Sequence, residues 1–189
     1  VTPTGSSVAS LFGLAIQNDG KILAAGTCQV ASSNSAVCIA RYQPDGSLDL
    51  SFGVTGRAIT PMSPGYDQGR RVAVQPDGKI LLSGTCFVSP SSYAFCLARY
   101  NANGSLDNTF GNSGTTISPT GQAGGFDHEN WSLAIQPDGK IVAGGSCRDG
   151  SETDFCATRY NINGSLDANF GIGGRAITSL TPDVDTAFD

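Results

Sequence analysis

The hexapeptide Gln75-Pro76-Asp77-Gly78-Lys79-Ile80 decides the fold, because the chain contains it three times. It returns unchanged at residues 136–141, and at residues 17–22 only Asn18 departs from it. Pro-Asp-Gly predicts a tight turn, since Pro holds φ at about −65° and Gly accepts a positive φ. The three copies lie 58 and then 61 residues apart. A period on this scale predicts a stacked or radial array in which each unit covers a face of its neighbour.

Each turn joins two strand-like segments, and two further strand candidates follow in every unit. A second landmark, residues 41–53, lies between the third and fourth candidates and returns at residues 99–111 and 159–171. The candidates are residues 14–17, 21–28, 37–42 and 57–59 in the first unit; 72–75, 79–86, 95–100 and 115–117 in the second; and 133–136, 140–147, 155–160 and 175–177 in the third. Four antiparallel strands per unit are the composition of a propeller blade.

The sequence therefore predicts an all-β, β-propeller-type repeat with three four-stranded antiparallel blades. Residues 1–189 are expected to form one repeat domain, with units at about 1–59, 60–117 and 118–177, and with 178–189 as a link toward a further blade or subunit. Propellers close with about four to eight blades. Three blades then form an open arc unless another chain completes it, and the alternative is that the sequence is a piece of a longer propeller. A parallel β-helix is the alternative, but its coils are shorter and contain fewer hairpin turns.

Composition supports strands and argues against two classes of function. Only 14% of the residues are charged, 25 are Gly and two are Glu, a balance that disfavours helices. The net charge is −5, and Arg70-Arg71 is the longest basic run. A nucleic-acid-binding protein needs clustered cations to neutralise phosphates. No apolar run approaches the roughly 20 residues of a membrane-spanning helix. We therefore expect neither a nucleic-acid partner nor a membrane span.

The six cysteines occupy matching places in the three units. They form the pairs Cys28/Cys38, Cys86/Cys96 and Cys147/Cys156, and each pair flanks a variable polar loop between the second and third strand candidates. This spacing excludes the C-x-x-C grouping of zinc and thioredoxin-like sites. Facing residues of an antiparallel pair lie within disulfide range. We expect three disulfides within the units rather than six free thiols, and hence an extracellular or cell-surface, secreted protein.

The landmarks of the three units resemble the delta-60 repeat family of bacterial surface and secreted proteins. The resemblance rests on AIQPDGKI (residues 134–141) and on ARYNANGSLDNTFG (residues 98–111), with counterparts in all three units. It implies a β-propeller built of such blades, and it implies neither a catalytic residue nor a cofactor. The cysteine pair in every unit departs from the commonest family pattern and favours a durable extracellular role.

An arginine and an aspartate recur in every unit, as Arg41/Asp49, Arg99/Asp107 and Arg159/Asp167. We interpret them as structural ion pairs, because an active site in a propeller gathers different residues from different blades. Residues 101–107 and 161–167 superficially resemble calcium loops. Ca²⁺ takes about six to eight oxygen ligands, including several carboxylates, whereas each of these loops offers a single Asp. A turn with an Asx-type hydrogen bond is favoured, and no metal or cofactor is expected.

Several singular residues invite a functional interpretation. His128, between two acidic residues, has no second His or free Cys to join it, so we expect a loop residue at a blade junction. Trp131 is expected in the core of the third unit, with an exposed sugar-binding platform as the alternative. Asn103, Asn130 and Asn163 match the N-glycosylation triplet, although Asn103 and Asn163 also belong to the repeated turn.

Three functions are compatible with these features. The first is an extracellular, non-enzymatic structural protein that self-associates into a filament or completes a propeller between chains. Residues 188–189 align with residues 126–127, in register for another unit, and Ile16 and Ile177 are expected on the outer faces. The second is a cell-surface binding module that recognises a glycan or a protein through the loops between paired cysteines. A polysaccharide-acting hydrolase or lyase comes last, because acid–base groups are scarce, and we expect no enzymatic activity.

Overall fold

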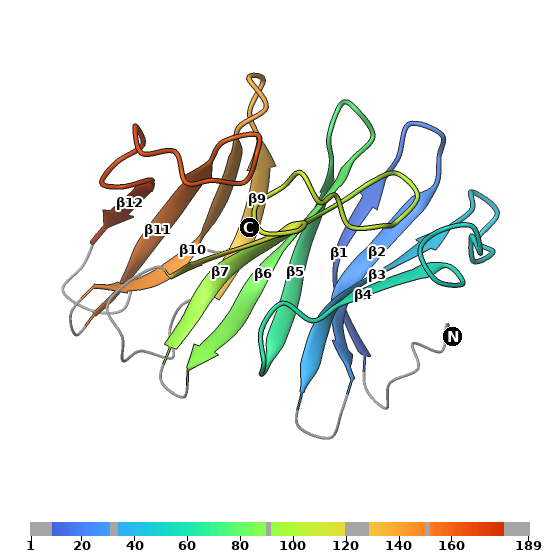
Figure 1. Ribbon diagram of the computed structural model, residues 1–189, viewed down its shortest axis with the longest axis horizontal. Helices are drawn as coiled ribbons and strands as arrows, with labels where there is room; N and C mark the ends of the chain where they lie inside the picture. The colour runs from blue at the N-terminus through green and yellow to red at the C-terminus, as the bar shows by residue number, and fades with distance from the viewer. Residues whose placement is uncertain (1–8, 31–33, 90–91, 120–128, 150–151, 180–189) are drawn as a thin grey trace.

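The computed structural model describes residues 9–30, 34–89, 92–119, 129–149 and 152–179 (Figure 1). These ranges contain twelve β-strands and no helix. The strands are β1 (Ala9–Ile16), β2 (Ile22–Gln29), β3 (Ser35–Tyr42) and β4 (Arg57–Thr60); β5 (Asp67–Val74), β6 (Ile80–Ser89), β7 (Ser92–Tyr100) and β8 (Thr115–Pro119); and β9 (Glu129–Ile135), β10 (Ile141–Asp149), β11 (Glu152–Tyr160) and β12 (Arg175–Thr178).

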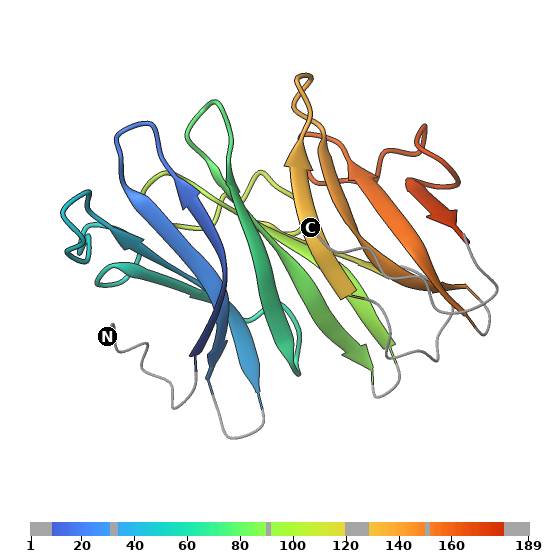
Figure 2. The same cartoon turned by 180° about the vertical axis from the view of Figure 1, so that it is seen from behind.

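Each sequence repeat forms one four-stranded antiparallel sheet with its strands in chain order, and we call these sheets blades 1, 2 and 3. The blades stack face to face, with β1, β5 and β9 side by side along the inner edge of the arc (Figure 1, Figure 2). The last strands, β4, β8 and β12, lie at the opposite edge of their sheets. No sheet in the described part of the chain joins blade 1 to blade 3, so the arc is open. This arrangement confirms the predicted three-bladed fold.

The repeated hexapeptide forms the hairpin turn between the first and second strands of each blade. In blade 2, the Gln75 amide donates to the Lys79 carbonyl at 2.8 Å, and the Lys79 amide donates to Asp77 Oδ1 at 3.1 Å. Gly78 takes a φ of 82°, which a residue with a Cβ rarely adopts. The turn therefore has the backbone geometry that Pro-Asp-Gly predicts.

Two clusters of buried apolar side chains fill the junctions between blades. Between blades 1 and 2, the cluster includes Leu23, Val37, Ile39 and Phe52 of blade 1 and Val72, Ile80, Leu82 and Tyr100 of blade 2. Between blades 2 and 3, it includes Leu81, Phe95, Leu97 and Phe110 of blade 2 and Ile141, Ala143 and Tyr160 of blade 3. Successive residues of β6, such as Ile80 and Leu81, thus point to opposite faces and are both buried. This two-sided burial explains the continuous apolar run of the strand.

A β-bulge interrupts the first strand of every blade at the same position. The extra residue is Phe12 in β1, Arg70 in β5 and Trp131 in β9. The Arg70 guanidinium carbon lies 5.0 Å from the centre of the Phe12 ring and 4.3 Å from the centre of the Trp131 ring. We call these three side chains the inner-edge stack. A bulge reverses the alternation of side chains by which a strand is recognised. The sequence pattern therefore missed the starts of these strands, which begin several residues before the predicted positions.

The cysteines of each blade form a disulfide, with Cα–Cα distances of 5.9 Å for Cys28–Cys38, 5.9 Å for Cys86–Cys96 and 5.4 Å for Cys147–Cys156. The two cysteines lie diagonally across the strands rather than face to face, since Cys28 pairs with Ala36 and Cys38 pairs with Gly26. Gly26 is needed there, because a Cβ would lie 1.9 Å from the Ser10 carbonyl oxygen at the bulge. The disulfides therefore tie strands two and three just beside the bulged inner strand.

Candidate blade-docking interface

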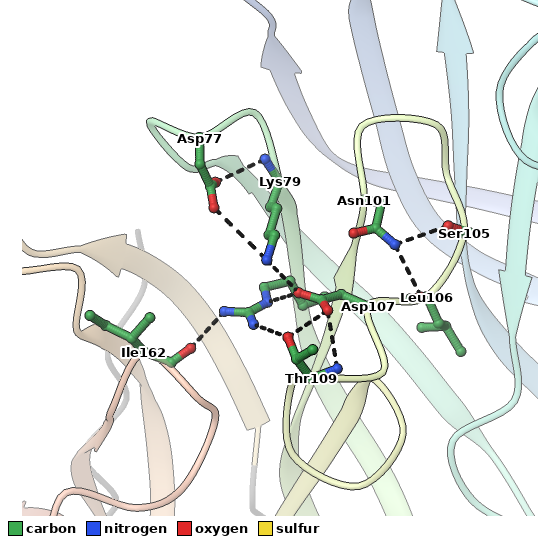
Figure 3. Close-up of polar contacts among 9 residues, drawn as sticks. Asp77, Lys79, Asn101, Ser105, Leu106, Asp107, Thr109 and Ile162 are labelled. Carbon is green, nitrogen blue, oxygen red and sulfur yellow. Dashed lines mark hydrogen bonds and ion pairs between the residues drawn. The ribbon is translucent and has the colours of Figure 1, made fainter.

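The predicted arginine–aspartate pair of blade 2 forms a buried polar cluster (Figure 3). Arg99 Nε donates to Asp107 Oδ2 at 2.8 Å, and Lys79 Nζ lies 2.9 Å from the same oxygen. Thr109 Oγ1 donates to Asp107 Oδ1 at 2.7 Å. The Arg99 guanidinium also lies over the ring of Phe110, 4.6 Å from its centre. We call Arg99, Asp107 and Phe110, and their equivalents in the other blades, the bracket of each blade.

Local turn chemistry holds the bracket in place. The Asn103 side chain accepts hydrogen bonds from the amide of Ser105 at 3.0 Å and from its hydroxyl at 2.7 Å, which is an Asx turn. The Asp107 amide then donates to the Arg99 carbonyl at 2.9 Å, so the segment after the turn returns to β7. The aspartate therefore reaches its arginine eight residues away because the intervening turn folds back on the strand.

The Asp107 carboxyl group is held in its charged form. Burial alone would raise its pKa, but hydrogen bonds from Lys79 and Thr109 and the charge of Arg99 lower the pKa well below its ordinary value. A buried carboxylate with this many donors is a structural anchor.

The bracket also reaches across the junction to the next blade. Arg99 Nη1 donates to the Ile162 carbonyl at 2.6 Å, and the Gly111 amide donates to the Asn163 carbonyl at 2.8 Å. Both acceptors belong to the turn that follows β11 of blade 3, between Arg159 and Asp167. Gly164 in this turn packs so closely on Phe110 that a Cβ would lie 2.9 Å from the ring.

The junction between blades 1 and 2 repeats these contacts. Arg41 Nε donates to Asp49 at 2.9 Å, Arg41 Nη1 donates to the Ala102 carbonyl at 2.5 Å, and the Gly53 amide donates to the Asn103 carbonyl at 2.7 Å. One difference is that Lys21 pairs with Asp19, whereas Lys79 and Lys140 each pair with the bracket aspartate of their own blade. The bracket is therefore a repeated docking device that locks one blade onto the turn of the next.

The third bracket has the same internal geometry, but no blade lies beyond it in the described residues. Arg159 Nε lies 2.8 Å from Asp167, and the guanidinium lies 4.6 Å from the centre of the Phe170 ring. The hydrogen bond from Lys140 is the main cause of the lowered pKa of Asp167. The Arg159 side chain is 21% exposed, compared with 5% for Arg99. Blade 3 therefore presents a formed bracket on a face that no other blade covers in the described part of the chain.

Blade 1 presents the complementary surface. Its turn around Gly46 matches the turns of Gly104 and Gly164, which the upstream blade covers. A Cβ at Gly46 would meet no atom within 4 Å in the described structure. The same face carries exposed Leu11, Leu14 and Ile16 and a shallow apolar groove of about 240 Å³.

The outer face of blade 3 is also apolar. Val142, Phe155, Ala157 and Phe170 are partly buried, whereas their equivalents in blade 2, Leu81, Phe95, Leu97 and Phe110, are fully buried. Ile177 was expected on this face, and that expectation is wrong. It pairs with Cys156, which packs in the cluster with blade 2, whereas Phe155 and Ala157 pair with Thr178 and Ala176. Ile177 therefore lies on the face toward blade 2, where its side chain is 37% exposed.

The other predicted site residues have different outcomes. Asn103 and Asn163 lie in exposed turns, and glycosylation there stays a prediction. Asn130 is fully buried, with Oδ1 accepting from the Ser83 hydroxyl at 2.7 Å, so the structure cannot accommodate a glycan on it. Trp131 is partly buried in the inner-edge stack. His128 lies outside the described residues, as do residues 31–33, 90–91 and 150–151 of the loops between paired cysteines.

Two features of the interface escaped sequence reasoning. Lys79 and Lys140 complete the brackets of their blades, and their recurrence at one place in every repeat was the available signal. Arg70 has a buried Nε without a hydrogen-bond partner in the described structure, and burial is the main cause that lowers its pKa. No periodic signal marks Arg70, because its equivalents are aromatic.

The described residues contain no group of three or more His, Cys, Asp or Glu side chains that could hold a metal ion. They also contain no helix with the length and apolar character needed to cross a membrane.

Four-stranded blades that dock face to face around a common inner edge define a β-propeller repeat protein. The chain belongs to the family described as "Domain of unknown function (DUF5122) beta-propeller", whose model matches residues 17–52, 75–110 and 136–170. Each match runs from the repeated hairpin turn to the bracket phenylalanine, which is Phe52, Phe110 or Phe170. The family motif and one complete bracket therefore cover the same segment. No curated protein matches the chain significantly.

Proposed function

We propose that this protein is an extracellular, non-enzymatic structural repeat protein that self-associates through the outer faces of blades 1 and 3. The contrast between Leu14 and Val72, which occupy the same place in two blades, carries the proposal. Leu14 is 63% exposed, whereas Val72 is 8% exposed because it packs in the cluster between blades 1 and 2. The outer face of blade 1 is therefore an exposed apolar surface whose equivalent in blade 2 is buried, and such a surface is suited to a partner.

The three disulfides support the proposed location. Disulfides persist in oxidising compartments and stabilise proteins outside the cell. The resemblance to delta-60 repeats of bacterial surface proteins points the same way, and we infer that those repeats and the matched family describe the same blade. A surface protein of this kind forms a filament or completes a propeller between chains.

Sedimentation of the disulfide-bonded 189-residue chain tests the proposal. We expect species larger than one chain at micromolar concentration. Leu14→Asp should shift the population toward single chains, because it places a charge on the outer face of blade 1. Leu50→Asp is the matched control, since Leu50 is 68% exposed and its equivalent Asn108 stays exposed in the covered blade 2. A chain that remains single at all concentrations would refute self-association.

A further inference from the structure

We infer that two copies of this chain dock head to tail, with the Arg159 bracket of each copy on the Gly46 turn of the other, into a closed six-bladed ring. The inference rests on the proposed self-association and specifies its geometry. It starts from a donor and an acceptor that the described chain leaves at opposite ends of the arc.

The donor is the third bracket. In both internal junctions, the bracket arginine uses Nε for its own aspartate and Nη1 for a carbonyl of the next blade. Arg159 makes the first of these contacts and is held over Phe170 in the same way. Its guanidinium is therefore already oriented for a carbonyl on a following blade.

The acceptor is the turn of blade 1. Ala102 and Ile162 supply the carbonyls in the internal junctions, and Pro44 occupies their place in blade 1. Gly46, two residues after Pro44, has open space above it. At the equivalent Gly104 and Gly164, the rings of Phe52 and Phe110 fill this space. At each equivalent position, the turn of blade 1 therefore matches the turns on which a bracket docks in the internal junctions.

These two surfaces are complementary to each other and not to themselves. Two blade 1 faces brought together would place turn against turn without a guanidinium, and two blade 3 faces would place Arg159 near its own copy. The docking chemistry therefore favours a head-to-tail join, which is heterologous.

A join that repeats the internal contacts also repeats the internal rotation between blades, so a second copy continues the same arc. Propellers close with about four to eight blades. For the 189-residue chain taken by itself, which has three blades, whole copies supply three, six or nine blades, and only six lies in that range. The second copy therefore closes the ring and uses both docking surfaces of both chains.

Two interface variants test the geometry. Arg159→Gln removes the donor, while Lys140 continues to pair with Asp167. Gly46→Asn fills the space above the turn of blade 1, and Asn tolerates the positive φ of 84° at this position. Gly78→Asn is the matched control, because Gly78 has a φ of 82° and equally open space on a hairpin of blade 2. Circular dichroism melts of each variant, recorded below the association range, verify folding.

Sedimentation equilibrium of each protein gives the outcome. We expect the 19.4 kDa chain to form a two-copy species. Arg159→Gln and Gly46→Asn should each raise its dissociation constant about tenfold or more. Gly78→Asn should leave the dissociation constant unchanged. An equal mixture of the Arg159 and Gly46 variants should recover a two-copy species, because one of its junctions is intact.

Three results would overturn the inference. A dimer indifferent to Arg159→Gln would show a back-to-back join, and a ladder of sizes that grows with concentration would show a join that does not close. Both leave the proposed self-association standing. A chain that never associates would overturn both proposals.

Discussion

Blades 2 and 3 have closely similar sequences and the same four strands, but among the described residues only blade 2 has another blade on both faces. The bracket phenylalanine is fully buried in blade 2, as Phe110, and partly exposed in blade 3, as Phe170. The ring and its arginine have the same 4.6 Å geometry in both blades. A blade therefore forms its docking device from its own residues, and the neighbour changes only how deeply that device is buried.

The bracket phenylalanines should give the largest difference between the two blades. We expect Phe110→Ala to lower the free energy of unfolding by about 3–5 kcal/mol, the usual loss for a fully buried aromatic ring. Phe170→Ala should lower it by clearly less, because solvent already reaches that ring. Urea unfolding at a concentration where single chains dominate measures both losses. Equal losses would contradict the comparison.

The disulfides allow a second comparison, between the covered blade 2 and the outer blade 1. The Cys86–Cys96 and Cys28–Cys38 bonds both join residues ten positions apart, so their effect on the unfolded chain is the same. Replacing either pair by alanines should lower the free energy of unfolding by about 2–4 kcal/mol. The loss should be greater for Cys86/Cys96, because both are fully buried whereas Cys38 is only partly buried. Thermal unfolding of the two double variants checks this order, and the reverse order would contradict it.

The bracket aspartates give a smaller difference that depends on pH. Asp107→Asn should lower the free energy of unfolding at pH 7 by about 1.5–3 kcal/mol, since it removes charge-assisted hydrogen bonds. The pKa of Asp107 in the folded protein lies below its unfolded value of about 3.9. The stabilisation is therefore complete above that value and is lost as the pH falls toward the folded pKa.

The gap between wild type and Asp107→Asn should accordingly narrow below about pH 4. Asp167→Asn, in the more exposed bracket, should produce a smaller gap at pH 7. Urea unfolding of the three proteins between pH 7 and pH 2.5 gives the comparison. A gap for Asp107→Asn that stays constant across this range would show that the carboxylate does not act as an anion.

The fold was predictable because its signals recur. A turn motif, a cysteine pair and an arginine–aspartate pair each appear three times in register, and the structure places each of them alike in every blade. The depth of burial was not predictable in the same way. The residues around Ile177 do not reveal which face of their strand is the outer one, and the pairing of Ile177 with Cys156 places it on the face toward blade 2.

The bulges explain most of the remaining differences. An extra residue in β1, β5 and β9 breaks the alternation by which a strand is recognised, so the starts of these strands were missed. The same bulge precludes glycosylation at Asn130, because it turns that side chain toward Ser83 in the junction with blade 2. A triplet motif carries no information about the direction of its side chain.

The inner-edge stack has a consequence for assembly order. Near-identical repeats risk joining to the wrong neighbour during folding, and the bracket alone would accept any blade. Phe12, Arg70 and Trp131 occupy equivalent positions but differ in chemistry, and the Arg70 guanidinium lies close to both rings. Two second blades placed side by side would bring two arginines together without a ring between them. The stack therefore favours the chain order of the blades, one, two, three, over a shuffled order in which second blades meet.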